Sequence, residues 1–598
     1  MTGRRVRRPP GRAVPPGRHA FRPAQADSEH FRLIRLRAGL LLIGLLLAMG
    51  GLGGRLISLH IVHARSLERL AERQQFAELV IQPRRGRLLD RWGRPLAINV
   101  DAESVYAVPS RIDDPAAFAR TVAPILGQRP ADVAARLRPD RHFVWLARRV
   151  PARTAQQLRS RAAHLGEAIG FLPEARREYP NGTLAAHILG FAGVDNQGLA
   201  GAEFAFERFL RGRAGLAHIE RDAMGRPRFE TRTVVVEPTD GADVVLTIDQ
   251  VIQHIAEREL DRALEATRAT WGAALVMEPR TGEILAMATS PRFDPNDFER
   301  ATPAEWNNPI LTRVYEPGST FKIVLAAAAL DAGVTDERQV FTNNGTYKVA
   351  GYTIREAHNR IFPRQTLRDI IRNSSNVGAA MVATRLGAEA FHATIRRLGF
   401  GLPTGLELPG EAAGLVPPPE QWGGAKLQTI GFGQGISATP LQVLVAAAAL
   451  ANDGLVVRPH ILRAVRDAEG RALEVTSVDP GRPAVAPGTA RKVMAMMVDA
   501  VARGTGTLAE LDGYLVAGKT GTAQKPAPSG GYLPDAYIAS FLGIVPADRP
   551  RLAILVLLDE PKGEYYGGVV AAPVFRAIAR QALWHLRVAP STDAVVVR

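Results

Sequence analysis

Apolar residues follow three different patterns along the chain. In the first, residues 38–54 read AGLLLIGLLLAMGGLGG, and no charge lies between Arg37 and Arg55. A helix of this length is about 26 Å long, and the LIS after Arg55 brings it close to the roughly 30 Å hydrocarbon core of a bilayer. This pattern predicts a transmembrane helix over residues 38–58.

The second pattern covers residues 59–236. Arg- and Ala-rich amphipathic helices, such as DPAAFARTVAPILGQRPADVAARL, alternate with short segments that contain glycine, such as RRGRLLDRWGRPLA. No repeat of fixed period is present, and no group of residues suggests catalysis. We therefore expect a separate N-terminal domain whose role is not chemical.

The third pattern begins near residue 237, with a helical stretch followed by long apolar runs. Residues 271–290 form two such runs around the turn PRTGE, and residues 538–561 form two more around PADRP, so each pair predicts a β-hairpin. An amphipathic helix follows over residues 572–588. Strands at both ends of an Ala-rich helical middle predict an α/β domain over residues 237–588, in which distant segments share one sheet. Residues 589–598 remain as a C-terminal tail.

Composition narrows the possible functions. The 598 residues are 46% hydrophobic, which is enough for several domains with real cores. The chain has no cysteine, which excludes a disulfide framework, a thiolate zinc site and a cysteine nucleophile. Half of the net charge of +16 lies in residues 1–37, where ten arginines face Asp27 and Glu29. The rest is spread thinly without a basic and aromatic stripe, so nucleic acid is not an expected partner.

Residues 1–37 are rich in Pro, Gly and Arg, which predicts a disordered basic tail. The arginine excess before the apolar segment places this tail in the cytoplasm and everything after residue 60 or so across the membrane. A cleaved signal peptide is the alternative. A basic leader of 37 residues is long for a signal peptide, which favours a retained single-pass anchor.

A serine and a lysine stand out in EPGSTFKIV, residues 316–324, because only seven of the 75 basic residues are lysines. Pro317 and Gly318 break the preceding chain, so Ser319 is suited to begin a helix that continues to Gly333. Lys322 lies one turn further on, within reach of the Ser319 hydroxyl. Lysine, unlike arginine, can lose its proton and act as a base for a serine nucleophile. Chance retention of a lysine is the plainer explanation for this pair alone.

Two further segments strengthen this hypothesis. RNSSNVGAA places Ser374 and Asn376 where a helix begins, although ordinary N-capping of that helix would explain them too. LVAGKTGTAQK contributes Lys519, Thr520, Gly521 and Thr522 after a short β run, and Gly521 would let a substrate backbone approach the strand. A plain strand with a glycine bulge is the alternative. The order Ser-x-x-Lys, Ser-x-Asn, Lys-Thr-Gly within one predicted domain indicates a single active site.

This set is a known signature of class A β-lactamases and penicillin-binding proteins, which have Asp in the middle triplet. Beyond the triplets, residues 35–580 resemble class B penicillin-binding proteins, the monofunctional peptidoglycan D,D-transpeptidases. The resemblance includes RGRLLDRWGRPLA, YPNGTLAAHILGFAG, Glu203, GFGQGISATPLQ and ASFLGIVP. YEPGST, where elongation enzymes tend to have a second proline, is most similar to the division-specific FtsI type. The implied fold is an antiparallel sheet with helices on both sides, preceded by an elongated pedestal domain.

The resemblance also implies a mechanism. Ser319 would attack the penultimate D-alanine of a stem pentapeptide, with Lys322 as its base and with Ser374 and Asn376 relaying protons and positioning the substrate. Lys519 with Thr520 would bind the terminal carboxylate, and the backbone N–H groups of Ser319 and Thr522 would form the oxyanion hole, each worth roughly 3 kcal/mol of barrier. No metal or other cofactor is expected for this chemistry.

Partners and location follow from the same resemblance. Expected partners are peptidoglycan stem peptides, β-lactam antibiotics, a lipid II polymerase of the FtsW type and other division proteins, and the expected location is the inner membrane with a periplasmic catalytic domain. An elongation-type paralogue, a β-lactam hydrolase or sensor, and a non-catalytic division scaffold remain as alternatives. The triplet Ser-Ser-Asn lacks Asp, and no deacylating glutamate can be placed, which disfavours the hydrolase. A scaffold would not need the intact triplets.

Overall fold

The computed structural model describes residues 28–68, 76–141, 143–220, 231, 233–357 and 360–591. The chain divides into two compact units: unit 1 comprises residues 1–79 and 218–233, and unit 2 comprises residues 80–217 and 234–598. The first 27 residues of the predicted basic tail and the last seven of the predicted C-terminal tail lie outside the described residues.

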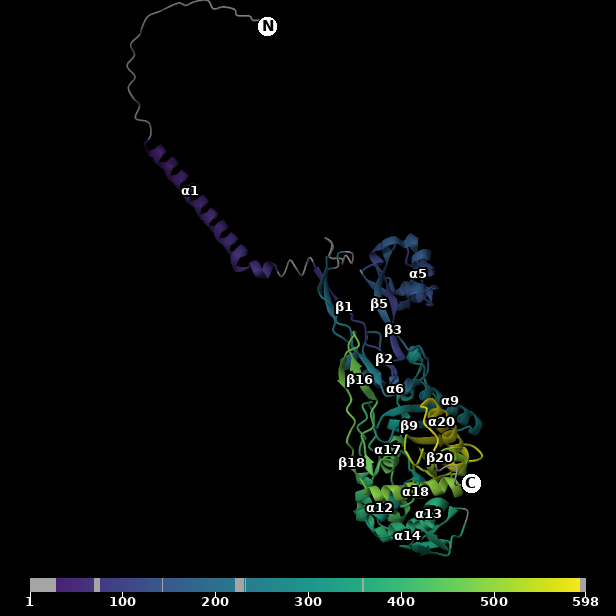
Figure 1. Ribbon diagram of the computed structural model, residues 1–598. Helices are drawn as coiled ribbons and strands as arrows, with labels where there is room; N and C mark the ends of the chain where they lie inside the picture. The colour runs from purple at the N-terminus through teal and green to yellow at the C-terminus, as the bar shows by residue number, and fades with distance from the viewer. Residues whose placement is uncertain are drawn as a thin grey trace, which may run out of the picture. The chain divides into compact units, whose positions relative to one another are not determined.

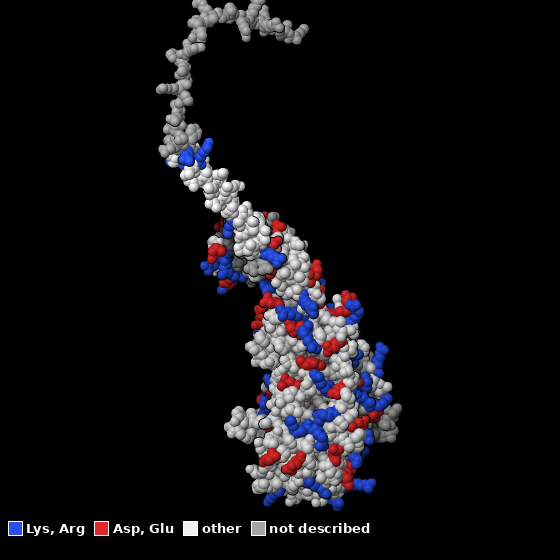
Figure 2. Space-filling model, turned by 90° about the vertical axis from the view of Figure 1, so that its left-hand side faces the viewer, with Lys and Arg blue, Asp and Glu red and all other residues white. Residues whose placement is uncertain are grey.

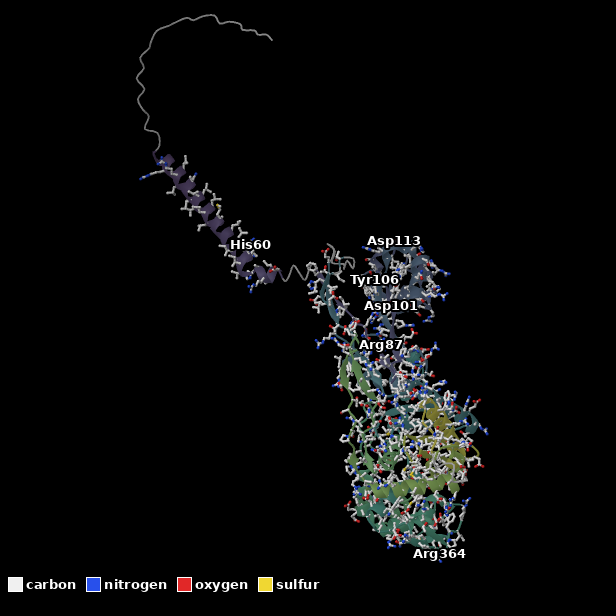
Figure 3. All side chains as sticks on the ribbon, viewed as in Figure 1. His60, Arg87, Asp101, Tyr106, Asp113 and Arg364 are labelled. Atoms are coloured by element: carbon white, nitrogen blue, oxygen red, sulfur yellow. The ribbon has the colours of Figure 1, made fainter. Side chains whose placement is uncertain are left out.

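Unit 1 contains the long apolar helix α1 (Ser28–Ile57), which continues as the π-helix η1 (Ser58–Val62). The helix begins ten residues before the predicted span, so the end of the predicted disordered tail is helical; Leu33, Ile34 and Leu36 extend its apolar character. In the described part of the chain, residues 32–62 alone are long and apolar enough to cross a membrane, with a mean hydropathy of 2.0. Side chains project from α1 on all sides (Figure 3), and Leu41 is 75% exposed.

The centre of unit 2 is a five-stranded antiparallel sheet in the order β10-β9-β21-β20-β19. Its strands are β9 (Trp271–Met277), β10 (Ile284–Ser290), β19 (Ala517–Pro526), β20 (Tyr532–Val545) and β21 (Leu552–Asp559). Two of its strands, β9 and β20, are labelled in Figure 1. Both predicted hairpins are confirmed, since Ile284 pairs with Met277 and Val545 with Leu552. β9 also pairs with β21, so segments far apart in sequence share one sheet, as predicted.

Helices cover both faces of this sheet. Ala274 and Val276 of β9 belong to a core built with α9 (Gln250–Thr267) and α20 (Ala572–His585). The alternate residues Ala273 and Leu275 belong to a second core with the helices of the opposite face. Because both faces of the sheet are buried, its strands are nearly continuous apolar runs, which is why the hairpins were visible in the sequence.

The helices of the second core include α17, of which all twelve residues are buried, and the Ala-rich α12. Small side chains on α12 allow close packing against α14, α15 and α18. The bounds are α12 (Lys322–Asp331), α13 (Leu367–Asn373), α14 (Asn376–Leu386), α15 (Ala388–Arg397), α16 (Lys426–Ile430), α17 (Pro440–Ala451) and α18 (Pro487–Arg503).

A second sheet of unit 2 has the order β17-β16-β8-β2-β3-β4, with β5 paired to β3. It joins strands on both sides of the predicted boundary at residue 236. Its strands are β2 (Leu88–Leu89), β3 (Pro95–Ala107), β4 (Val144–Pro151), β5 (Ile169–Glu178), β8 (Asp243–Leu246), β16 (Leu462–Arg466) and β17 (Ala472–Val475). Strands as short as β16 and β17 carry too little periodicity to reveal such a distant pairing.

A buried ion cluster explains several residues of the sequence motifs in the N-terminal part of unit 2. Arg85 donates from Nε to Glu203 Oε2 at 2.5 Å, and Arg177 donates to Glu203 Oε1 at 2.6 Å. The Tyr179 hydroxyl donates to the same carboxylate at 3.3 Å. All four side chains are buried, so this cluster joins β5, α7 and the segment before β2.

The remaining elements are short helices and short strands outside the two sheets described above. Before β8 they are β1 (Phe76–Ile81), η2 (Pro109–Arg111), α3 (Pro115–Val122), α4 (Pro130–Arg136), α5 (Ala152–Arg161), η3 (Ala163–Ala168), α6 (Ala186–Leu189), α7 (Gly201–Ala205), α8 (Glu207–Leu210), β6 (Gly215–Glu220) and β7 (Thr233–Val236). After β10 they are η5 (Pro295–Arg300), α10 (Pro303–Trp306), α11 (Pro309–Thr312), η6 (Gly318–Phe321), β11 (Val340–Thr342), β12 (Thr346–Val349), β13 (Tyr352–Arg355), β14 (Arg364–Thr366), η8 (Pro419–Gln421), β15 (Leu455–Val456), β18 (Arg482–Pro483), η9 (Thr507–Ala509) and α19 (Gly567–Val570).

Charged side chains of both signs are interspersed on the surface of unit 2 that Figure 2 shows. Ion pairs between exposed side chains of unit 2 include Arg471 with Asp467 and Arg491 with Asp453.

Candidate active site

The segment around Ser319 is a 3₁₀ turn. This turn, η6, covers Gly318–Phe321, and α12 begins only at Lys322. The prediction that Ser319 begins the α-helix is therefore wrong, because Gly318 has a positive φ of 55° and the chain enters the helix through a tighter turn. In a 3₁₀ turn, positions i and i+3 lie directly above one another, so Ser319 and Lys322 still share one face. Ser319 is partly exposed, whereas Lys322 is fully buried.

The GFGQGISATPLQ segment holds this turn in place. Gly318 donates its backbone N–H to the carbonyl of Gly433 at 3.0 Å, and Gly435 donates to the Glu316 carboxylate at 2.8 Å. A side chain at position 433 would come within 2.1 Å of the Gly318 carbonyl oxygen. Glycine at position 433 is therefore required for the close approach of the two loops.

The middle triplet forms the junction between α13 and α14. Ser374 ends α13 in a left-handed conformation, with φ 58° and ψ 39°, and Ser375 caps α14 by accepting from the Gly378 N–H at 2.9 Å. N-capping, the alternative for Ser374 and Asn376, thus applies to the serine between them. Lys322 donates from Nζ to the Ser374 carbonyl at 2.6 Å and to Asn376 Oδ1 at 2.7 Å.

The third segment lies on β19, the edge strand of the central sheet. The buried Lys519 donates from Nζ to Ser374 Oγ at 2.9 Å and to the Thr520 carbonyl at 3.1 Å. The hydroxyl of Thr520 is hydrogen-bonded to that of Thr505 at 2.8 Å. Thr522 Oγ accepts from the N–H of Gly567, at the start of α19, at 3.2 Å. The strand is thus fixed on both sides of Gly521.

The structure gives a different reason for glycine at position 521 from the predicted approach of a substrate backbone. A Cβ at this position would lie 2.2 Å from Ser540 Oγ and 2.9 Å from Thr320 Cγ2. The side chains of Ser540 and Thr320 occupy the space that a Cβ would need, so glycine at position 521 lets η6 pack closely against β19. The glycine bulge of the alternative is absent, because β19 is a strand whose pairing with β20 is regular through this position.

The three segments meet at the Ser374 hydroxyl, which accepts from Lys322 at 3.3 Å and from Lys519 at 2.9 Å. Residues 52 and 145 positions apart in sequence are therefore neighbours. The expected direct hydrogen bond between Lys322 and the Ser319 hydroxyl is not formed: among the described residues, this hydroxyl has no hydrogen-bond partner. Ser374 instead lies between the two lysines.

Burial determines the charge state of both lysines. Removal from water lowers the pKa of the Lys322 amine from 10.5 to about 7, against the opposing effect of the Glu356 carboxylate. Burial, followed by the charge of Lys322, holds the pKa of Lys519 well below its ordinary value. At neutral pH the site can therefore present an uncharged amine, which a serine nucleophile needs as its base.

Sequence reasoning missed three residues that shape this site. Ser375 caps α14, Thr505 bonds to Thr520, and the buried Glu356 accepts hydrogen bonds from Ser375, Asn376 and Val377. The serine between the two predicted residues could have been found from its capping position. The sequence around Glu356 and Thr505 carries no comparable signal, because their contacts are made across the fold.

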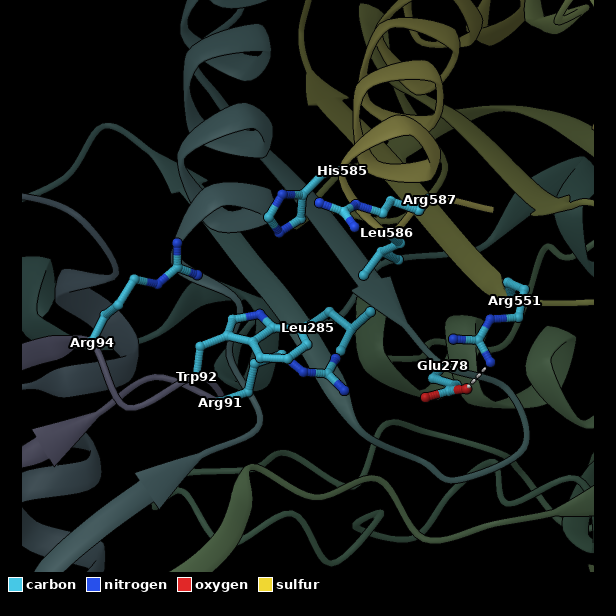
Figure 4. Close-up of a pocket in the computed structure, with 9 residues that line it drawn as sticks. All are labelled: Arg91, Trp92, Arg94, Glu278, Leu285, Arg551, His585, Leu586 and Arg587. Atoms are coloured by element: carbon cyan, nitrogen blue, oxygen red, sulfur yellow. Dashed lines mark ion pairs between the residues drawn. The ribbon is translucent and has the colours of Figure 1, made fainter. Parts of the chain in front are cut away.

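A cavity of about 520 Å³ lies elsewhere in unit 2 (Figure 4). It is lined by Arg91, Trp92, Arg94, Glu278, Leu285, Arg551, His585, Leu586 and Arg587. Three of the arginines are paired with acids: Arg91 with Glu283, Arg94 with Asp90 and Arg551 with Glu278. These pairs neutralise much of the charge of the cavity wall. No group of three His, Asp or Glu residues suited to hold a metal occurs in the described ranges.

Comparison with known proteins assigns both parts of unit 2. Residues 272–580 match the penicillin-binding protein transpeptidase domain, and residues 80–246 match the penicillin-binding protein dimerisation domain. The chain is 33% identical to peptidoglycan D,D-transpeptidase FtsI of Escherichia coli over 94% of both chains. It is 34% identical to stage V sporulation protein D of Bacillus subtilis, over 90% of this chain and 84% of that protein.

Solved structures agree with this assignment. Penicillin-binding protein 3 of Mycobacterium tuberculosis has a TM-score of 0.67 and 30% identity, over 86% of this chain and 98% of that one. The same protein in complex with ampicillin has a TM-score of 0.68. The chain therefore belongs to the class B penicillin-binding proteins, the peptidoglycan D,D-transpeptidases that combine a dimerisation domain with a transpeptidase domain of the serine acyl-transfer type. This confirms the resemblance found in the sequence.

Proposed function

We propose that Ser319 is the nucleophile of this transpeptidase and carries the acyl group between donor and acceptor stem peptides. The single observation that supports this role is the convergence of three motifs on the Ser374 hydroxyl, with two buried lysines directed to it. Ser319 attacks the carbonyl carbon of the penultimate D-alanine, and the bond to the terminal D-alanine breaks. An amine of a second stem peptide then displaces Ser319.

The protons move through Lys322 and Ser374. Uncharged Lys322 takes the proton of the Ser319 hydroxyl. Ser374 gives its hydroxyl proton to the leaving amine and takes one back from Lys322, while Asn376 holds the Lys322 amine in position. The backbone N–H groups of Ser319 and Thr522 receive the oxyanion. Gly521 contributes by allowing η6 and β19 to lie close together.

Lys519 and Thr520 bind the terminal carboxylate of the donor peptide. A carboxylate that enters the site favours the charged form of Lys519, and the charged Lys519 disfavours a charge on Lys322. Donor binding thereby keeps Lys322 in the uncharged form that the first step requires.

The test is covalent labelling of the detergent-solubilised full chain with a fluorescent penicillin, followed by mapping of the modified peptide. We expect one adduct at Ser319 and no labelling of Ser319→Ala. Ser529→Ala, at an exposed serine of the loop between β19 and β20, is the matched control and should label normally. Normal labelling of Ser319→Ala would refute the proposed role of Ser319.

β-Lactams are expected to bind the same site, because the related protein from Mycobacterium tuberculosis has been solved with aztreonam and with ampicillin. The adduct should be long-lived. Rapid turnover of a chromogenic cephalosporin by the purified chain would indicate the hydrolase alternative instead.

We further propose a role in septal synthesis, anchored in the inner membrane by α1 with the N-terminus in the cytoplasm and the catalytic domain in the periplasm. The similarity to FtsI over 94% of both chains and the apolar segment of residues 32–62 support this proposal. Depletion should make cells filament; widening or rounding would indicate the elongation-type paralogue.

The N-terminal part of unit 2, with the motif at Arg85–Arg91, is proposed to contact an FtsW-type polymerase. Substitution of Arg87, the exposed residue of this motif, should reduce septal synthesis while penicillin labelling stays intact. Unchanged septal synthesis would contradict this contact.

A further inference from the structure

A single carboxylate supports the turn that carries Ser374 and Asn376. Glu356 follows β13 and is only 5% exposed. Its Oε1 accepts from the Ser375 hydroxyl at 2.5 Å and from the Val377 N–H at 3.2 Å, while its Oε2 accepts from the Asn376 N–H at 2.7 Å. Both oxygens are therefore used by three consecutive residues at the start of α14.

The other hydrogen bonds of the Ser375 hydroxyl determine that it donates its proton to Glu356. Its Oγ accepts from the Gly378 N–H at 2.9 Å and from Gln365 Nε2 at 3.1 Å, so its own proton is available only to Glu356. Backbone N–H groups at a helix start attract negative charge, and the carboxylate satisfies two of them. Glu356 thus fixes the backbone on which Ser374 adopts its left-handed conformation.

The same carboxylate also acts on the nearby Lys322. Among the described residues, Glu356 after β13 is the charged group that acts on the Lys322 amine, and Lys322 in turn lowers the pKa of Lys519 on β19. The negative charge of Glu356 raises the pKa of Lys322 and thereby opposes the effect of burial. Uncharged Ser374 and Asn376 provide the remaining polar contacts of the amine.

We propose that Glu356 is a positioning residue for acylation: it orients the Ser374–Asn376 turn toward Lys322 and places a negative charge near that buried amine. It acts through the turn and not on the substrate. This inference rests on the proposed roles of Ser319 and Lys322 and adds a residue to them.

Two substitutions separate the geometric role from the electrostatic one. Glu356→Gln removes the charge and offers one acceptor oxygen to three donors, so its NH₂ group must face a donor. Glu356→Asp keeps the charge but shortens the side chain by one methylene. Glu389→Gln, at an exposed glutamate in the first turn of the neighbouring α15, is the matched control.

The experiment measures the second-order rate constant for acylation of the full chain by a fluorescent penicillin from pH 5.5 to 9. Because a rate constant describes only folded, reactive molecules, partial misfolding lowers the amplitude and not this value. We expect Glu356→Gln to be slower by ~10–100-fold, the cost of misplacing a reacting group by about 1 Å. The acidic limb of its pH–rate profile should move to lower pH, because loss of the nearby negative charge lowers the pKa of Lys322.

Glu356→Asp should be slowed less and should keep the midpoint of the acidic limb. The proposal is overturned if Glu356→Gln acylates within about twofold of Glu389→Gln, or if its acidic limb is not displaced. An Asp variant as fast as the parent would overturn the geometric part even if the Gln variant fails to fold. Labelling of Ser319→Ala would instead refute the proposed function, whatever the Glu356 variants do.

Discussion

Lys322→Arg tests the central chemical argument, that this position needs a base that can lose its proton. The amine is fully buried and has a pKa of about 7, so about half of the Lys322 side chains are uncharged at pH 7. Arginine keeps its charge, because its pKa is above 12, and fewer than about one side chain in 10⁵ would be uncharged at the same pH.

The Lys322→Arg variant therefore has no uncharged side chain at this position to take the Ser319 proton. Removal of a general base costs ~10²–10⁴ in rate, which corresponds to about 3–5 kcal/mol of activation free energy. The guanidinium can still donate to the Ser374 carbonyl and to Asn376 Oδ1, which accept from Lys322 in the parent chain. We therefore expect the turn to remain supported while acylation slows by this factor.

The assay is the rate constant for acylation by a fluorescent penicillin at pH 7.5, with thermal unfolding measured on the same samples. Lys348→Arg, at an exposed lysine of β12, is the control and should match the parent chain. If Lys322→Arg retains more than about a tenth of the parent rate with an unchanged melting temperature, another group removes the Ser319 proton and our reasoning is wrong.

Three further predictions concern pH, packing and stability. The acylation rate of the parent chain should fall about tenfold per pH unit below about 7 and level off above it, because only uncharged Lys322 can accept a proton; a rate that is flat from pH 5.5 to 8 would contradict this. Gly521→Ala should cost about 1–3 kcal/mol by overpacking against Ser540, and Ser540→Gly in the same chain should recover part of the lost melting temperature. Arg85→Met should lower stability by about 3–5 kcal/mol in a denaturant titration, since it leaves the buried Glu203 short of a partner; a change below about 1 kcal/mol would show that Arg177 alone suffices.

The sequence by itself was sufficient to predict the features that depend on patterns of neighbouring residues. Strands buried on both faces are continuous apolar runs, so the hairpins β9–β10 and β20–β21 were predicted with their turns. The apolar segment after Arg37 predicted a membrane-length helix, and residues 32–62 have that length and composition. Rare lysines in two of the three short motifs indicated the active site, because lysine differs chemically from the arginine that this chain otherwise uses.

Only the tertiary structure decided how these pieces make a site. The 3₁₀ turn at Ser319, the left-handed Ser374 and the role of Gly521 depend on the neighbouring loops and strands, which no local pattern encodes. Glu356 was invisible in the sequence because its three hydrogen bonds cross 19 to 21 residues and its burial comes from the fold. Pairing of β16 with β8 was missed for the same reason: propensity and periodicity act over neighbouring residues, whereas burial and partner choice are set by contacts between distant ones.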